Sequence, residues 1–213
     1  RQLNVPGVDR LTGAGIYYGA ALTEAAHYRG KHVFVVGGAN SAGQASMFFS
    51  RFASKVTMIV RGTSLTRSMS QYLIDQIENT ENIEVLTNTI VLEASGDTRL
   101  ESIRIKNKVT EEEQDLPAAA MFVFIGAISH SEMVADVVVT NSAGFIRSGI
   151  SLMRNGKRPK WWTLKRDPFP LETSIPGIFV AGDVRDKAIR RVAAAVGDGA
   201  AAVNQVHQYL KTV

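Results

Sequence analysis

At positions 31–42 the sequence reads KHVFVVGGANSA, a β-branched run from Lys31 to Val36 followed by glycines and other small residues. Such a run is typical of a buried parallel strand. We expect a helix directly after it, from about Ser41 to Ala53, with Asn40 or Ser41 able to cap its first turn. This stretch therefore predicts a strand, a tight turn and a helix in succession.

The turn fits the dinucleotide-binding fingerprint G-x-G-x-x-G/A, with Gly37, Ala39 and Ala42 at its three positions. Small residues are needed there because backbone N–H groups and the positive end of the helix must approach a pyrophosphate. The methyl group of Ala39 stands where that approach is closest, so a weakened affinity is expected. The alternative is a tight turn without a ligand. The candidate phosphate-binding residues are Gly37, Gly38, Ala39, Asn40, Ser41 and Ala42.

The chain continues in the pattern of an α/β nucleotide-binding fold. A second strand, helix and third strand complete a β-α-β-α-β order, and three alternating segments then predict an antiparallel meander before a last strand that Gly126 ends. We therefore predict a Rossmann-like three-layer fold. The expected ranges are 56–60, 68–78 and 83–86, then 89–94, 100–106 and 114–116, and finally 120–125.

The pattern changes after Ser129. Irregular chain and a basic stretch from Arg154 to Arg166 precede an expected strand at 177–181 and an Ala-rich helix from about Ile189 to Leu210. The basic stretch contains Trp161 and Trp162, and could be a platform for single-stranded nucleic acid. We favour a loop whose tryptophans pack on the domain, and we expect no nucleic-acid partner.

The end of the second strand predicts which nucleotide is bound. An NAD site would place an acidic residue there, about 20 residues after the glycine turn, to hold the ribose 2′-hydroxyl. The sequence instead has Arg61, followed by Arg67. Because a guanidinium suits a 2′-phosphate, these cations favour NADP(H) over NAD(H), the alternative being two solvated surface side chains.

Composition limits the other classes of function. The 213 residues, 45% hydrophobic and 21% charged, suffice for real cores. The absence of cysteine excludes disulfides and thiolate nucleophiles in this chain. No apolar run reaches the length of a bilayer span and no signal peptide is evident, so we expect a cytoplasmic protein with no membrane partner. The four histidines are scattered and are interpreted as surface or packing residues.

Three motifs resemble low-molecular-weight thioredoxin reductases. The loop from Val35 to Ala42 is similar to their V-I-G-G-G-N-[ST]-A. Met58 to Arg67 is similar to their H-R-R-x-x-x-R segment, which holds the NADPH 2′-phosphate, although Gly62 replaces the second arginine. The run TSIPGIFVAGD, Thr173 to Asp183, is similar to their T-x-x-P-G-[IV]-[FY]-A-A-G-D. The resemblance covers essentially the whole chain, and is closer still to a subgroup often fused to a cyclic-nucleotide-binding domain.

This resemblance implies NADPH and FAD as cofactors and a homodimer in the complete protein. It assigns Asp183, next to Gly182, to the ribityl chain of FAD. It also assigns Arg190, Arg191 and Val192 to the helix N-terminus that faces the flavin pyrimidine ring, where negative charge on reduced flavin is favoured. Gly126 belongs to the family's I-G-x-x-P turn and completes the cofactor-binding candidates.

Two departures from the family shape the expected function. The redox C-x-x-C pair is replaced by Gly19 to Ala25, so electrons cannot reach a disulfide in the usual way. The first half of the FAD domain is missing, so we expect a fragment that does not retain FAD and is inactive alone. We assign residues 1–15 to a connector and FAD-domain remnant, 16–130 to the NADPH-binding domain and 131–213 to the C-terminal portion of the FAD domain.

Two functions remain open at this stage. The first is an NADPH-dependent flavin oxidoreductase that passes hydride to flavin and on to an unknown acceptor other than a disulfide. The second is a nucleotide-sensing or scaffold module that has lost catalysis, which Ala39, Gly62 and Ser129 favour, Ser129 standing where the family has proline.

Overall fold

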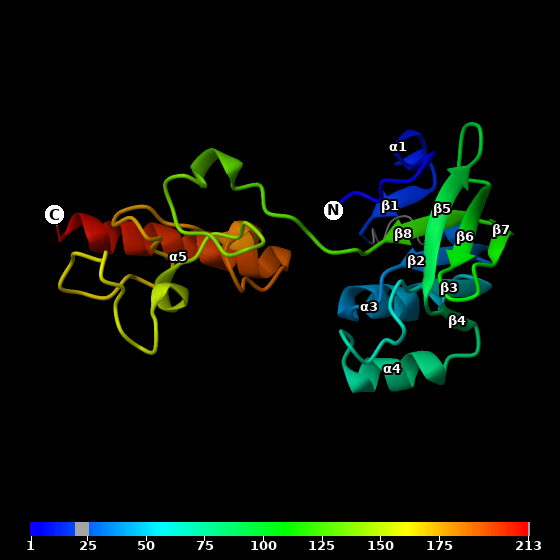
Figure 1. The fold of residues 1–213 in the computed structure, drawn as a ribbon, viewed down its shortest axis with the longest axis horizontal. Coiled ribbons are helices and arrows are strands. Elements are labelled where there is room, and N and C mark those ends of the chain that lie inside the picture. The colour runs from blue at the N-terminus through cyan, green and yellow to red at the C-terminus, as the bar shows by residue number, and fades with distance from the viewer. Residues whose placement is uncertain (20–25, 213) are drawn as a thin grey trace. The chain divides into compact units, whose positions relative to one another are not determined.

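The computed structural model describes residues 1–19 and 26–212. The chain divides into two compact units, which we call unit 1, Arg1–Gly126, and unit 2, Ala127–Val213. Both are visible in Figure 1. The assignment of nucleotide-binding and flavin-binding roles to the predicted ranges 1–15, 16–130 and 131–213 stays a prediction.

Unit 1 is built on a five-stranded parallel sheet in the order β1-β8-β2-β3-β4. Val36 at the end of β2 lies opposite both Ile59 of β3 and Val123 of β8, so the carboxyl ends of these strands meet at one edge. The direction of strand order reverses beside β2, which makes this edge a topological switch point. The strands are β1 Ile16–Tyr18, β2 His32–Val36, β3 Lys55–Ile59, β4 Ile83–Leu86 and β8 Ala120–Val123.

Two layers cover the faces of this sheet, as Figure 1 shows. Val33 and Val35 of β2 share an apolar core with helices α3 (Asn40–Phe49) and α4 (Gln71–Glu78). Phe34 and Val36 share a second core with an antiparallel sheet of β5 (Thr89–Ser95), β6 (Ser102–Asn107) and β7 (Glu113–Pro117). The predicted three-layer α/β fold with a β-meander is confirmed.

Several short elements of unit 1 were not predicted. Residues 1–15, expected to be irregular, contain the helix α1, Val8–Leu11, whose Val8 and Leu11 are buried in the core beneath the meander. The edge strand β1 and the 3-10 helix η1, Ala26–Tyr28, were also missed. Elements of three or four residues are too short to show a period, so the sequence pattern contains no signal for them.

Unit 2 contains one long helix, α5, Val192–Leu210, which begins three residues after the predicted start at Ile189. The rest is irregular chain with short 3-10 helices η2 (Glu132–Val134), η3 (Gly149–Leu152) and η4 (Gly182–Val184). The predicted strand at 177–181 is wrong, because Phe179 forms only an isolated bridge with Glu172. The Thr173 N–H donates to the Ile178 carbonyl at 2.8 Å, which makes this segment a loop closed on itself.

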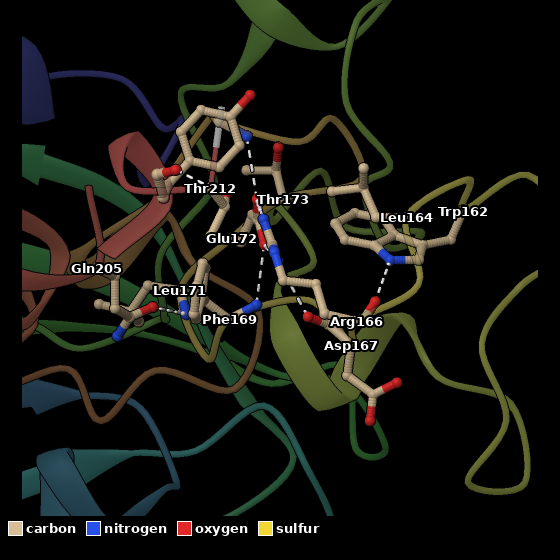
Figure 2. Close-up of polar contacts among 12 residues, drawn as sticks. Trp162, Leu164, Arg166, Asp167, Phe169, Leu171, Glu172, Thr173, Gln205 and Thr212 are labelled. Atoms are coloured by element: carbon tan, nitrogen blue, oxygen red, sulfur yellow. Dashed lines mark hydrogen bonds and ion pairs between the residues drawn. The ribbon is translucent and has the colours of Figure 1, made fainter. Parts of the chain in front are cut away.

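An ion pair between the buried Glu172 and the partly exposed Arg166 lies next to that loop (Figure 2). The Glu172 side chain is fully buried and accepts hydrogen bonds from the Arg166 guanidinium, 2.8 Å between Nη2 and Oε1. Its oxygens also accept from the N–H groups of Phe169, at 2.9 Å, and Gly177, at 3.0 Å. Burial alone would raise the pKa of Glu172, but these donors outweigh it and hold the pKa below its ordinary value.

The basic stretch packs around the same arginine. Trp162 is buried and its Nε1 donates to the Arg166 carbonyl at 2.7 Å, so the prediction of a packed tryptophan holds for Trp162. Trp161 is 48% exposed and its ring meets the Trp162 ring edge to face, so the same prediction holds only in part there. The Arg166 guanidinium also lies over the Phe169 ring, 4.2 Å from its centre.

Candidate functional site

The turn after β2 requires a glycine at its first position. Gly37 has φ +145°, and a Cβ on it would lie 2.5 Å from the Phe124 carbonyl oxygen and 3.2 Å from the Ala42 Cβ. Gly38 is constrained as well, because a Cβ there would lie 2.9 Å from Val60 Cγ1. The backbone of the turn therefore passes closer to β3 and β8 than any side chain would allow.

Helix α3 begins directly beyond the turn and points its N-terminus to the same edge. The Gly43 N–H donates to the Ala39 carbonyl at 3.1 Å, and the N–H groups before it in the first turn have no partner within a helix. Ala42 is buried beneath the turn, whereas Asn40 and Ser41 are exposed. An N-terminus with unused N–H groups attracts negative charge.

The predicted helix cap is wrong. Ala39 is the N-cap of α3, and Asn40 and Ser41 lie inside the first turn. Ala39 has φ −106° and ψ 176°, extended backbone that alanine adopts without strain. Its methyl group is exposed rather than packed, so alanine is accommodated in the fold. The helix also ends earlier than predicted, at Phe49.

Side chains fasten the segment after β3 to the candidate phosphate-binding loop, Gly37 to Ala42, which we call the phosphate loop for short. The Ser68 hydroxyl donates to the Gly38 carbonyl at 2.8 Å. Asn40 bonds Ser70 twice, because its Nδ2 donates to Ser70 Oγ at 3.1 Å and its Oδ1 accepts the Ser70 N–H at 2.8 Å. Asn40 therefore positions the neighbouring segment, a role that the sequence motif alone did not indicate.

Arg61 and Arg67 lie on this fastened segment, between the end of β3 and α4. Leu65 and Met69 of the same segment are buried in the core with α3, and this packing anchors the segment. Both arginines are exposed, and among the described residues neither forms an ion pair. Two uncompensated cations thus belong to a segment bonded to the phosphate loop.

Gly126 follows β8 at the same edge of the sheet. The Phe124 N–H donates to the Val36 carbonyl at 2.7 Å, which fixes the chain after β8 beside the phosphate loop. Gly126, two residues further, has φ +87°, a conformation that favours glycine. The unit 1 candidates therefore all follow the carboxyl ends of β2, β3 and β8.

The remaining candidates form a second group, within unit 2. Gly182 begins η4 with φ +74°, and its N–H donates to Asp198 Oδ2 of α5 at 3.1 Å. The Asp183 carboxylate is exposed. Arg191 is the N-cap of α5, the exposed Val192 begins that helix, and the Arg190 guanidinium lies 4.3 Å from the centre of the Phe145 ring.

Sequence reasoning missed the pair that positions this second group. Arg185 donates to Asp198 Oδ2 from both Nε, at 3.0 Å, and Nη2, at 2.8 Å. Because the same oxygen accepts the Gly182 N–H, Asp198 joins the turn at Asp183 to α5. Asp198 is the middle residue of Gly197-x-Gly199, where the motif treats the residue type as free.

Within the described residues, neither a metal site nor a membrane-spanning helix adds to these candidates. Across residues 1–19 and 26–212, no three metal-binding side chains gather as a metal site would require. Within the same residues, no helix has both the length and the apolar character needed to cross a membrane. Residues Ala20 to Ala25, most of the predicted replacement for the C-x-x-C pair, lie outside the described residues.

The switch point of the parallel sheet carries a glycine turn, a helix N-terminus and two arginines without an ion pair among the described residues. This arrangement defines an α/β protein of the dinucleotide-binding class. The family described as pyridine nucleotide-disulphide oxidoreductase matches residues 1–199. The chain belongs to this family.

Similar proteins include several thioredoxin reductases. The chain is 34% identical to thioredoxin reductase 1 of Saccharomyces cerevisiae, over 100% of this chain and 61% of that protein. It is 30% identical to thioredoxin reductase of Bacillus subtilis, over 99% of this chain and 60% of that protein. The Lactococcus lactis thioredoxin reductase structure covers the whole chain with a TM-score of 0.78 and 27% identity, and 63% of that structure is covered. The chain thus spans about 60% of the length of these relatives.

Proposed function

We propose that this chain is the nucleotide-binding part of an NADPH-dependent, FAD-containing oxidoreductase of the thioredoxin-reductase type. The observation that carries the proposal is the edge of unit 1, where the glycine turn, the α3 N-terminus and the segment bearing Arg61 and Arg67 are fastened together. Relatives named thioredoxin reductases support this reaction class.

The residues at this edge fit the phosphates of NADPH. A Cβ on Gly37 would clash with the Phe124 carbonyl oxygen, so glycine is needed for the tight turn that leads the backbone to the proposed pyrophosphate position. Gly38, Ala39, Asn40, Ser41 and Ala42 would present the first-turn N–H groups to it. Arg61 and Arg67 would bind the 2′-phosphate by charge-assisted hydrogen bonds, which an NADH ribose cannot provide.

The unit 2 group fits a role toward FAD. One carboxylate oxygen of Asp198 accepts the Gly182 N–H and the Arg185 Nε–H, and so holds the backbone of this turn in place. The next residue, Asp183, is exposed, and its carboxylate would be available to FAD. Arg191 and Val192 begin α5, whose 19 residues give that end a positive potential. When bound, NADPH would supply a hydride and FAD would accept it.

The acceptor is proposed to be something other than a protein disulfide. The chain contains no cysteine, so it supplies no dithiol that could relay electrons from the flavin to a disulfide. The residues described above bind and orient cofactors, and none is placed as a general acid or base. A homodimer of the complete protein is part of the same proposal.

Calorimetric titration of the chain with NADPH and, in parallel, NADH tests the nucleotide role. We expect saturable binding that prefers NADPH, and Arg61→Ala should weaken NADPH by about tenfold while changing NADH little. Arg51→Ala is the matched control, because Arg51 is equally exposed but follows the opposite end of α3. Equal weakening of both nucleotides by Arg61→Ala would remove Arg61 from the 2′-phosphate site.

A second candidate is a nucleotide-sensing module without catalysis. It is favoured by Ala39, whose exposed methyl group lies at the tightest position of the fingerprint, and by the absence of cysteine. Tight NADPH binding by the complete protein without flavin reduction under anaerobic conditions would select this candidate. Flavin bleaching on NADPH addition would select the oxidoreductase instead.

A further inference from the structure

A cavity opens in unit 1 at the edge of the sheet opposite the phosphate loop. Its volume is about 800 Å³, within the roughly 300–1,000 Å³ of small-molecule sites. His32, which lines it, is the first residue of β2, whereas Gly37 follows the last. The cavity is therefore separate from the proposed nucleotide site, and an inference about it goes beyond the proposed function.

One wall of the cavity is fixed backbone. The Leu100 N–H donates to the Ala14 carbonyl at 2.8 Å, and the Ala118 N–H donates to the Glu101 carbonyl at 2.9 Å. Gly15 has φ +115°, and a Cβ on it would lie 2.6 Å from the Leu100 Cβ. This wall is formed before any ligand arrives, which lowers the cost of binding.

Aromatic rings provide an apolar surface, in which the Tyr17 and Tyr28 rings meet edge to face at 62°. Tyr17 and Tyr28 both line the cavity, and their hydroxyl oxygens are 3.0 Å apart in a hydrogen bond to each other. Tyr17 is also stacked on Phe122, with ring centres 5.4 Å apart, so its plane is fixed. A planar ligand could pack against such rigid rings.

The charged lining favours an anion. Lys31 and Arg99 contribute two permanent cations, against the single carboxylate of Glu101. In the described part of the chain neither cation forms an ion pair, and Lys31 Nζ lies 5.8 Å from the centre of the Tyr28 ring. The cationic lining would attract a ligand carboxylate beside the aromatic surface.

His32 adds a directed polar group whose protonation can be assigned. The Thr57 hydroxyl lies 3.1 Å from a Glu84 carboxylate oxygen and 2.8 Å from His32 Nε2. Because a carboxylate only accepts, the hydroxyl donates to Glu84 and must accept from His32 Nε2–H. Burial first, and then the nearby Lys55 cation, hold the pKa of His32 below its usual value, against the opposing charge of Glu84. The neutral ring thus keeps Nδ1 as an acceptor.

We propose that this cavity binds a small aromatic acid, with an apolar ring body against the tyrosines, a carboxylate toward the Lys31 and Arg99 cations, and a hydroxyl donating to His32. The class is set by the combination of rings, cations and acceptor. A simple inorganic anion would leave the aromatic wall unused.

Titration with 6-hydroxy-2-naphthoate, followed by NMR of the histidine rings, tests the proposal. Of the four histidines, His27 and His32 line the cavity, while His130 and His207 belong to unit 2. We expect saturable shifts of the His27 and His32 signals only, unchanged in the presence of saturating NADPH. 2-Naphthol, which lacks the carboxylate, should bind about fivefold more weakly.

Substitutions separate the cavity from nonspecific binding. The double variant Lys31→Gln with Arg99→Gln should weaken the naphthoate by about fivefold, since both ion pairs are solvent exposed. Lys108→Gln is the matched control, an exposed lysine at the β6–β7 turn. The proposal is overturned by any of three results: no shift of His32 at 5 mM probe (roughly the weakest affinity of interest), displacement by NADPH, or equal affinity in the double variant.

Discussion

In unit 1, successive residues of β2 alternate between two apolar cores. In unit 2, by contrast, the chain packs around a fully buried carboxylate, that of Glu172. Among the described residues of unit 2, a small apolar cluster has Val138, Ile146 and Val180 as its buried members. Phe145, Leu152, Trp162 and Leu171 are buried outside this cluster. Helix α5 adds no buried side chain to it. Unit 1 therefore depends mainly on nonpolar burial, whereas unit 2 combines less nonpolar burial with the charge-assisted hydrogen bonds of Glu172.

Because of this difference, we expect the two units to respond differently to mutation. An apolar core distributes its contacts over many side chains, each of which contributes a part. A buried ion pair concentrates its effect, because removing one partner leaves the other charge desolvated and unpaired. We expect single substitutions to weaken unit 1 in proportion to the volume removed, and unit 2 according to whether the Arg166 charge keeps its partner.

The largest expected effect is that of Phe122→Ala in unit 1. Phe122 is fully buried and stacks on Phe49 with ring centres 4.0 Å apart. The substitution should therefore lower the free energy of unfolding of unit 1 by about 4 kcal/mol. Amide hydrogen exchange of peptides from β2 and α5 would report the two units separately. Phe48→Ala, at a partly buried position, is the control and should cost about half as much. Equal loss in both variants would contradict a core packed around Phe122.

Glu172→Gln should destabilise unit 2 by about 3 kcal/mol, because Arg166 stays behind without a counter-charge. Both tryptophans of the chain lie in unit 2, so fluorescence during urea unfolding reports this unit. Glu132→Gln, whose side chain is 76% exposed, is the matched control and should change little. An unchanged midpoint in Glu172→Gln would show that the apolar cluster alone suffices.

The same pair predicts a pH dependence. The pKa of Glu172 is lower in the folded chain than its usual 4.5, so its stabilisation is present above pH 4.5 and is lost as pH falls through the folded value. The fluorescence midpoint of the natural chain should therefore fall on acidification below pH 4.5. In Glu172→Gln this fall should be smaller, and an equal fall would assign it to other carboxylates.

The contrast explains which parts could be predicted from sequence. Unit 1 alternates apolar residues at the period of its strands, and Gly37 marks the turn, so its sheet, helices and phosphate loop followed from local pattern. The segment at 177–181 is also rich in β-branched residues, yet it forms a loop. The Gly177 N–H donates to the Glu172 carboxylate, and the Thr173 N–H donates to the Ile178 carbonyl. Both bonds span five residues, and neither is reflected in the periodicity of the sequence.

The same limit applies to the site. The positions of Gly37 and Arg61 followed from motif spacing, because a fixed number of residues separates consecutive strand ends. The bonds of Ser68 to Gly38 and of Asp198 to Gly182 join residues 30 and 16 positions apart. Their partners are backbone groups, which have no residue type, so no pairing of sequence letters could have indicated them.

A polar chain in unit 1 provides the smallest test of the comparison. His32, Thr57 and Glu84 are joined through the Thr57 hydroxyl, and Lys55 pairs with Glu84 at 2.9 Å. Unlike Glu172, the Glu84 side chain is 45% exposed, so water can replace a lost partner. Thr57→Val should therefore cost unit 1 only about 1 kcal/mol. Thr98→Val, at an exposed bend, is the control. A loss near that of Glu172→Gln in hydrogen exchange of β2 would mean that unit 1 also depends on a polar network, and the division between the two units would then fail.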